Sequence, residues 1–415
     1  MSINAGATGL REKKTEMAMP QPLGGLLSLA ALLLISEAVW YGIFSPAGPI
    51  SLYTPNVGLA LVITILMVIH WGIDVFEFWP FSRGFIIEAN SLVKGFILLT
   101  VYVGVAAAVM FGIYYNVIGR FGPIFFSGPQ LIVTGGLGQY SQTAIENGCY
   151  AQIMMNTCII FFTIMWVRSF GFSPWEQSCS LTKSFSVWLI GMFLAIIAFS
   201  VLFYPHIAYQ FYPPQTFMAA LPWWSDWAMT QSSLFHFGWI VPALVLLYWT
   251  KMLWEGRPFS LITTGWVRGI ITIVSVIASG ILIMFVGNWI MNWYFGGEAF
   301  MGGNTTEQPA WRWNHIAEMA MFMQTAAVIL FYYFDNWPSK LSLPARALVR
   351  TAIAIAGGLI IAKLYYVLGP IFLGTVQGIG QDNDTSLCWT VMVLILIVAH
   401  AEFFDGIPFK KRIKG

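Results

Sequence analysis

The chain has 415 residues, of which 58% are hydrophobic and only 9% are charged, with a formal net charge of +2. A soluble domain carries about 25% charged residues, so this composition excludes a water-soluble fold and predicts an all-α polytopic membrane protein. The basic residues are dispersed and no nucleotide-binding motif occurs, so neither a nucleic-acid partner nor a nucleotide cofactor is expected.

Ten apolar segments follow one another along the chain, each long enough to cross a bilayer, because about 20 apolar residues span its hydrocarbon core. The predicted transmembrane helices cover residues 23–44, 56–75, 95–117, 149–168, 184–204, 234–253, 269–292, 316–334, 350–369 and 386–404. A polar N-terminal segment (1–20) precedes this single membrane domain (21–409), and a basic tail (410–415) follows it.

The distribution of basic residues predicts the orientation. Of the 20 Lys and Arg residues, 17 lie in the two termini or in the segments that follow even-numbered helices. Only Arg120 and Arg312 lie on the opposite side. Because basic residues accumulate in cytoplasmic loops, both termini are expected to be cytoplasmic in a multi-pass protein of the plasma (cell inner) membrane.

A six-residue signature recurs where even-numbered helices leave the membrane: an aromatic residue, an acid, two variable residues, a proline and one more residue. Its copies are FEFWPF (76–81), WEGRPF (254–259), FDNWPS (334–339) and FDGIPF (404–409), with a degenerate FGFSPW (170–175) that has Gly171 in place of the acid. Proline soon after a helix end terminates the helix. An acid at a helix C-terminus opposes the helix dipole, so the four acids are expected to pair with nearby Lys and Arg.

The spacing of these signatures divides the chain into five tandem helical hairpins, each with an outgoing and a returning helix. Their bounds are about 21–81, 82–175, 176–259, 260–339 and 340–409. The outgoing helices are rich in small residues, as in AIAIAGG (352–358), whereas the returning helices are bulkier. Small residues let helices approach closely in lipid, so we expect the outgoing helices to form an inner, quasi-fivefold ring around a central axis.

This layout is similar to that of the slow-anion-channel and tellurite-resistance transporter family, which also builds a ten-span channel from five hairpins. The resemblance covers span count, orientation and hairpin repetition, with no shared sequence motif. It implies a path along the central axis, between the outgoing helices.

Two charged residues fall inside predicted helices: Glu37 in LISEAVW and Lys363 in IIAKLYY. A charge at mid-membrane costs at least about 2.5–3.5 kcal/mol, so such residues usually face the protein interior and find a partner. Helices one and nine are neighbours in a closed ring of hairpins, which predicts a Glu37–Lys363 ion pair. The pair could fix ring closure or line a substrate or proton path; alternatively, Lys363 extends outward to the membrane surface.

Three histidines, His206, His236 and His315, lie at the outer ends of predicted helices. His315 and Glu318 are three residues apart and therefore share a helical face. Together with Asp226 in an outer loop, these side chains leave open a transition-metal site, although they form no compact ligand motif. The alternative is that the histidines are amphipathic interface residues.

His70 and His400 lie in returning helices shortly before their signatures. Two histidines at one depth on different helices could ligate haem or relay protons. Packing and hydrogen bonding between helices is the simpler interpretation of both.

The outer loops at residues 118–148, 205–233, 293–315 and 370–385 are long and rich in Gly, Pro and aromatic residues. Such composition favours folded segments that cap the outer face, where protein partners could dock. The lipid bilayer is the partner that the composition itself requires.

Three classes of function fit these observations. The first is a transporter or channel for a small solute or ion, with its path between the outgoing helices and Glu37 and Lys363 lining it. The second is the membrane subunit of a larger complex, including a redox complex, and the third is a membrane metalloenzyme with an outer-face site. We favour transport because repeated hairpins generate an axis, while enzymatic activity and the substrate stay open.

Overall fold

The computed structural model describes residues 15–81, 86, 89–133, 141–211, 232–295, 309–374, 376 and 386–412. Within them, ten helices are long and apolar enough to cross a membrane, which confirms the predicted number of spans and the class of multi-pass membrane protein. The spans comprise α1 (Leu23–Val39) with η1 (Trp40–Phe44); α2 (Pro55–His70) with η2 (Trp71–Val75); α4 (Ser91–Ala107) with η3 (Ala108–Ile118) and α5 (Gly119–Phe121); α7 (Ser141–Phe170); α8 (Ser180–Ala198) with η6 (Phe199–Phe203) and α9 (Tyr204–Phe211); α12 (Ser233–Met252); α13 (Gly265–Phe295); α14 (Pro309–Tyr333); α15 (Leu343–Phe372); and α16 (Ser386–Val398) with η8 (Ala399–Phe403).

Shorter elements connect these spans. They are the 3-10 turns η4 (Ile124–Phe126) and η7 (Phe259–Leu261), the helix α6 (Gly128–Val133) and the strands β1 (Thr15–Met17) and β2 (Lys410–Arg412). Several helices exceed their predicted bounds: α7 begins at Ser141, whereas the prediction began at residue 149. Helical hydrogen bonding does not require apolar side chains, so a helix continues beyond the segment that composition marks.

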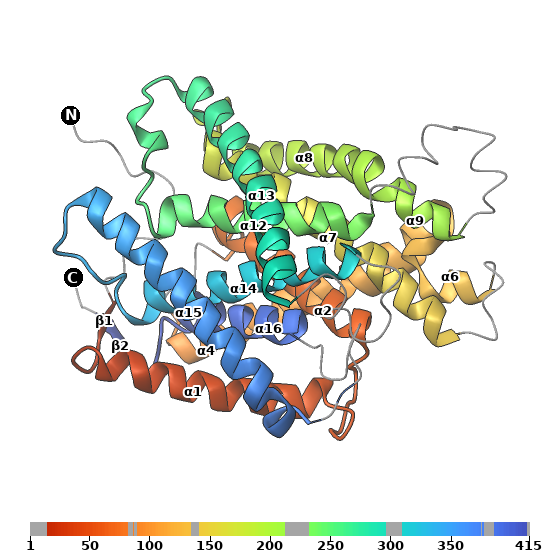
Figure 1. Cartoon of the computed structure of the whole chain (residues 1–415), viewed down its shortest axis with the longest axis horizontal. Coiled ribbons are helices and arrows are strands. Elements are labelled where there is room, and N and C mark those ends of the chain that lie inside the picture. The colour runs from red at the N-terminus through yellow and green to blue at the C-terminus, as the bar shows by residue number, and fades with distance from the viewer. Residues whose placement is uncertain are drawn as a thin grey trace.

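The even-numbered spans form a closed inner ring. Helix α2 packs against α7 and α16, α7 against α12, α12 against α14, and α14 against α16. In these five spans 61–78% of the apolar window is buried, against 28–33% in the odd-numbered spans. Figure 1 shows the outer helices α13 and α15 lying obliquely across the inner helices, with α1 and α8 along opposite edges.

The expectation that the small-residue outgoing helices form the inner ring, with a path between them, is therefore wrong. Their small residues serve contact with the inner helices. A β-carbon at Gly280 of α13 would collide with α12 at Ala243, and one at Gly358 of α15 would collide with α14 at Met323. Small residues on one narrow face thus let each outer helix pack closely on its inner neighbour. Bulky side chains on the other faces of the outer helices, such as Ile360 of α15, are exposed and would contact lipid.

Each outer helix packs on the inner helix that precedes it in the chain: α4 on α2, α8 on α7, α13 on α12 and α15 on α14. Helix α1 has no preceding inner helix and packs instead on α16 and α14. Strands β1 and β2 pair antiparallel, with Thr15 opposite Arg412, and the N–H of Ala18 donates to the carbonyl of Phe409 at 2.7 Å. The segment before α1 is thereby tied to the segment after α16, and β1 and β2 lie at the left end of Figure 1.

The five signature prolines mark one end of the ring, which we call the signature end; the opposite end, with α6 and α9, is the loop end. In each copy the X–Pro peptide bond is cis. The four acids adopt left-handed backbone, with φ of 47–53°, and Gly171 replaces the acid with φ of 66°. The N–H after each acid donates to the carbonyl six residues earlier, at 2.7–2.9 Å, in Phe78, Gly256, Asn336 and Gly406. Helix ends that close through a left-handed residue satisfy their last carbonyls in this way.

The aromatic residue that opens each signature contacts the start of an outer helix from the next position in the ring. Phe404 and Phe76 pack edge-on against Phe96 of α4 and Phe185 of α8. The other contacts are Phe170 with Gly269 of α13, Trp254 Nε1 with Thr351 Oγ1 of α15 at 2.8 Å, and Phe334 with Gly25 of α1. We call each of these contacts, with its signature acid, a clasp.

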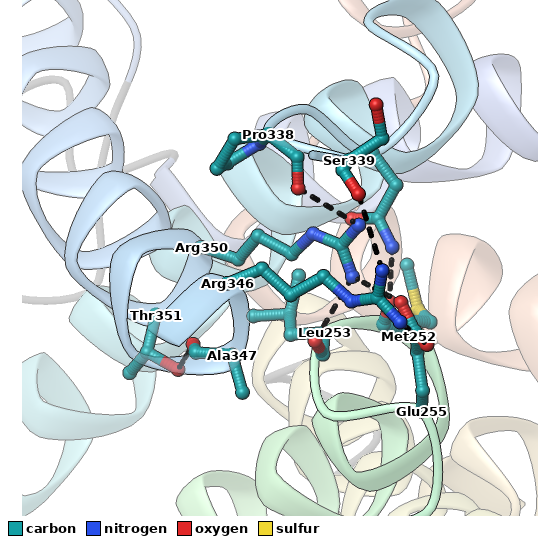
Figure 2. Close-up of polar contacts among 10 residues, drawn as sticks. Met252, Leu253, Glu255, Pro338, Ser339, Arg346, Ala347, Arg350 and Thr351 are labelled. Carbon is teal, nitrogen blue, oxygen red and sulfur yellow. Dashed lines mark hydrogen bonds and ion pairs between the residues drawn. The ribbon is translucent and has the colours of Figure 1, made fainter. Parts of the chain in front are cut away.

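The acids complete the clasps. Lys94 Nζ lies 2.5 Å from Asp405, Lys183 Nζ 3.1 Å from Glu77, and Arg350 NH1 2.7 Å from Glu255. These contacts confirm the predicted pairing for three acids. The fourth, Asp335, accepts instead from the amide of Gln21 at 3.0 Å. Figure 2 shows the Glu255 clasp, where Arg350 also donates to the Pro338 carbonyl at 3.2 Å and so joins two signatures.

Candidate functional site

Charged side chains gather inside the inner ring at its signature end. Asp74 lies in η2, one turn after His70, and its carboxylate accepts from His70 Nδ1 at 2.9 Å and from the guanidinium of Arg168 on α7. His70 is 3% exposed, and its Nε2 is buried without a hydrogen-bond partner among the described residues. The pair of Nδ1 and carboxylate fixes the imidazole and leaves Nε2 for water or a solute.

The remaining inner helices complete this charged cluster. Tyr332 of α14 donates to Glu402 of η8 at 2.7 Å. Tyr248 of α12 places its ring 5.8 Å from the guanidinium carbon of Arg168. Lys251, one turn further along α12, interacts electrostatically with both Asp74 and Glu402. All five inner helices thus contribute to a cluster of two carboxylates and two permanent cations around a histidine.

Sequence reasoning missed most of this cluster. In the sequence, Arg168 and Lys251 count only among the 17 basic residues that indicate the orientation, and no role is predicted for Asp74. The signal was present, since Asp74 follows His70 by four residues and shares its helical face. What the sequence could not supply is that the ends of five helices converge.

A cavity of about 380 Å³ lies at the loop end of the ring. Its walls come from α2, α7, α12 and α14, with His206 of α9, and its polar side chains include the amides of Asn56, Asn147 and Asn314. Helices α2 and α14 are separated by α16 on one side of the ring and by α7 and α12 on the other, so a cavity that touches both extends across the loop end of the ring. Among the described residues that line this loop-end pocket there is no Asp, Glu, Lys or Arg.

A buried polar chain lies between the α2–α7 pair and its outer neighbour. Tyr114 of η3 donates to Asn156 of α7 at 2.6 Å, and Asn156 donates to Thr64 of α2 at 2.8 Å. Thr64 returns its hydroxyl proton to the carbonyl of Ala60 at 2.6 Å. Each polar group in this chain has a partner, as the low-dielectric interior requires.

Glu37 and Lys363 lie apart from the ring interior. Both are on outer helices, Glu37 half-buried and Lys363 exposed, and neither enters an ion pair within the described part of the chain. Their helices do meet, because Trp40 Nε1 donates to the carbonyl of Leu373 at 3.1 Å. The two spans are therefore neighbours as expected, whereas the described residues show no ion pair between Glu37 and Lys363.

The outer histidines have separate partners. His206 Nδ1 lies 2.8 Å from Ser233 Oγ, and Trp239 donates to His236 at 3.3 Å. His315 and Glu318 form the contact that their spacing predicts, with Nδ1 and Oε2 2.6 Å apart.

No group of three or more His, Cys, Asp or Glu residues suited to a metal ion occurs among the described residues. Asp226 lies outside those residues. Glu318 instead accepts from Asn314 and Tyr366, at 2.8 and 3.3 Å.

His400 forms hydrogen bonds at the end of its own helix. Its Nε2 lies 3.2 Å from the carbonyl of Ile407 and therefore donates, so Nδ1 accepts from Tyr333 at 2.9 Å. His70 holds Asp74, as described above. The two histidines thus make separate hydrogen bonds within and between helices.

Comparisons with protein-family models, with curated proteins and with solved structures each found no match. The class of the chain, a multi-pass membrane protein, rests on its ten apolar helices.

Proposed function

We propose that this protein is a membrane transporter for a small uncharged polar solute. The loop-end pocket binds the solute, and the charged cluster closes the path at the signature end. The observation that carries this proposal is that α2, α7, α12 and α14 line the pocket at one end and supply charged-cluster residues at the other. A binding site and a polar closure in one ring are the parts that alternating access needs.

The signature end faces the cytoplasm in this proposal, with both termini on that side. Seventeen of the 20 basic residues support this orientation. The loop-end pocket then opens outward, and the contacts correspond to an outward-facing state whose cytoplasmic end is closed by Asp74 and Arg168.

The ring is built from five repeated units in this proposal. The clasp contacts support it, because the first aromatic of every signature contacts the outer helix one position onward. The packing favours a repeated unit that consists of an inner helix, its signature and the outer helix that follows in the chain. The fifth unit consists of α16 and α1, whose neighbouring segments are joined by the pairing of β1 with β2. This division into repeated units differs from the hairpins of an outgoing and a returning helix that the spacing of the signatures suggests.

The chemistry of the pocket favours an uncharged solute. Amides and a histidine offer both donors and acceptors, and the described lining residues include no Asp, Glu, Lys or Arg to serve as a counter-ion for a permanent charge. Apolar side chains such as Leu59 and Phe237 complete the walls and would contact carbon atoms of the solute. Solute-binding sites commonly combine an apolar lining with a few polar groups in this way.

The test measures whether substitutions at the signature end change access to the loop-end pocket. In a variant with all four cysteines replaced by alanine, a single Asn147→Cys reporter in the pocket is labelled by a membrane-impermeant methanethiosulfonate from the loop side. Adding Asp74→Asn removes the charge that holds Arg168, favours opening at the signature end and lowers the labelling rate. The charge-swapped pair Asp74→Arg with Arg168→Asp restores it.

If Asp74→Asn and the charge-swapped pair both leave the labelling rate of Asn147→Cys unchanged, the two ends are uncoupled, and this result would contradict alternating access. Uptake of urea, glycerol and glucose into proteoliposomes, followed by light scattering, then tests flux directly. Flux that Asp74→Asn alters supports transport, and the absence of flux for all three solutes, together with uncoupled labelling, would sink the proposal.

A further inference from the structure

Four outer helices carry a cation at an equivalent place in the clasp. In α4, α13 and α15 the cation directly precedes a residue that contacts the signature aromatic. In α8 it precedes Ser184, which is next to the contact residue Phe185. The pairs are Lys94 before Gly95, Lys183 before Ser184, Arg268 before Gly269 and Arg350 before Thr351. Equivalent placement predicts equivalent partners, and three of the four cations have a signature acid.

Arg268 is the exception. The signature that faces α13 has Gly171 where the other copies have an acid, and a β-carbon at Gly171 would meet no atom within 4 Å. Phe170, the neighbour of Gly171, packs on Gly269, so the usual clasp geometry is retained. Within the described residues the guanidinium of Arg268 has neither an ion pair nor a side-chain hydrogen bond, so its position in the clasp lacks only the anion.

The surroundings of Arg268 are those of a membrane boundary. The apolar span begins at Gly265, and Trp266, Ile270 and Val274 are exposed on the same helix. Tryptophan is enriched at the headgroup level, and exposed aliphatic side chains below it face acyl chains. An anion at this depth is therefore accompanied by an apolar surface.

We propose that the phosphate of an anionic phospholipid takes the place of the missing acid and binds Arg268. A guanidinium matches phosphate with two parallel hydrogen bonds, and the open space at Gly171 leaves room for the headgroup. The lipid thereby completes the clasp between α7 and α13. This inference rests on the clasp contacts and is independent of whether the protein transports a solute.

The experiment compares the full-length protein in nanodiscs of phosphatidylcholine alone with nanodiscs that also contain phosphatidylglycerol. Phosphatidylglycerol retained on the protein is counted by native mass spectrometry, and thermal unfolding is followed in both lipids. The wild type should retain the lipid and unfold at a higher temperature when it is present. Arg268→Gln should retain it about fivefold more weakly and lose the lipid-dependent shift.

A second variant separates this proposal from a general loss of stability. Gly171→Asp supplies the missing acid in a turn where Asp335 and Asp405 already adopt positive φ. It should fold, pair with Arg268 and abolish the lipid-dependent shift while raising the unfolding temperature in phosphatidylcholine. Arg257→Gln, which removes an exposed cation at the same end, is the matched control and should retain the wild-type response.

Equal loss in Arg257→Gln would show that surface charge alone attracts the lipid and would overturn the site. A full response to inorganic phosphate in phosphatidylcholine nanodiscs would overturn the lipid as the occupant. An unchanged lipid response in Gly171→Asp would show that Arg268 does not depend on the missing acid, and would overturn the proposal as well.

Discussion

Arg350 and Glu255 form an ion pair in which only one partner is buried: the Arg350 side chain is 3% exposed and the Glu255 side chain 36%. The guanidinium also reaches the carbonyls of Leu253 and Pro338, so it joins the ends of α12 and α14 to the start of α15. Figure 2 shows Arg346 approaching the same carboxylate from one turn earlier. This asymmetry decides what each substitution should cost.

Glu255→Gln should destabilise the protein by about 2 kcal/mol, because it leaves a buried guanidinium with carbonyl partners only. Unfolding in SDS measures the change. The double variant Glu255→Gln with Arg350→Met removes the stranded charge and should recover part of the loss. Arg346→Met, at the more exposed cation, should cost no more than about 1 kcal/mol. Equal costs for Arg346→Met and Glu255→Gln would contradict the asymmetric role of the two arginines.

Cys179 should be the reactive cysteine of the native protein, because Cys149, Cys158 and Cys388 are buried and Cys179 is exposed. The Thr182 hydroxyl, 3.0 Å from Sγ, stabilises the thiolate and lowers the pKa of Cys179 below its usual 9.0. Its labelling rate should therefore rise at lower pH than that of a free thiol and level off earlier. Thr182→Val should move this pH profile upward.

The sidedness of Cys179 labelling tests the proposed orientation. A membrane-impermeant maleimide should label it in inside-out vesicles and spare it in right-side-out vesicles. Labelling from the outside would place the signature end outside and reverse the topology.

Asn156→Leu should cost about 1 kcal/mol, because it leaves the Tyr114 hydroxyl without its acceptor and removes a donor to Thr64. Thr157→Val is the matched control on the same helix, since the Thr157 hydroxyl donates to the Ile153 carbonyl of its own helix and has no other hydrogen bond among the described residues. Unfolding in SDS compares the two. Equal effects would mean that the chain from Tyr114 to Thr64 contributes nothing between helices.

Gly25→Val should weaken the closure of the ring, because a side chain there would collide with the Tyr333 carbonyl and the ring of Phe334. Overpacking of this kind costs about 1–3 kcal/mol. Limited proteolysis between α1 and α2 measures the release of α1. Gly42→Val is the control, since a β-carbon at Gly42 meets no atom within 4 Å. If both variants are cleaved alike, α1 is not held by the Phe334 clasp.

The properties that depend on composition and on short-range contacts could be predicted from the amino-acid sequence. Ten apolar runs became ten helices, and three of the four signature acids found basic partners. A hydrocarbon core admits only segments that satisfy their own backbone, so length and apolarity suffice to find the spans. The i,i+3 contact of His315 with Glu318 is local in the same sense.

Which helices lie inside the ring depends on packing between distant parts of the chain. Small residues on α13 and α15 were compatible with an inner or an outer position, since either places them against another helix. The bulky helices occupy the inner ring, where protein covers most of their surface. An outer helix needs only one narrow face of small residues to pack on its inner neighbour. Convergence of five helix ends then assembled Asp74, Arg168 and Glu402 from distant parts of the chain. Glu37 and Lys363 lie on outer helices, where neither forms an ion pair with another described residue.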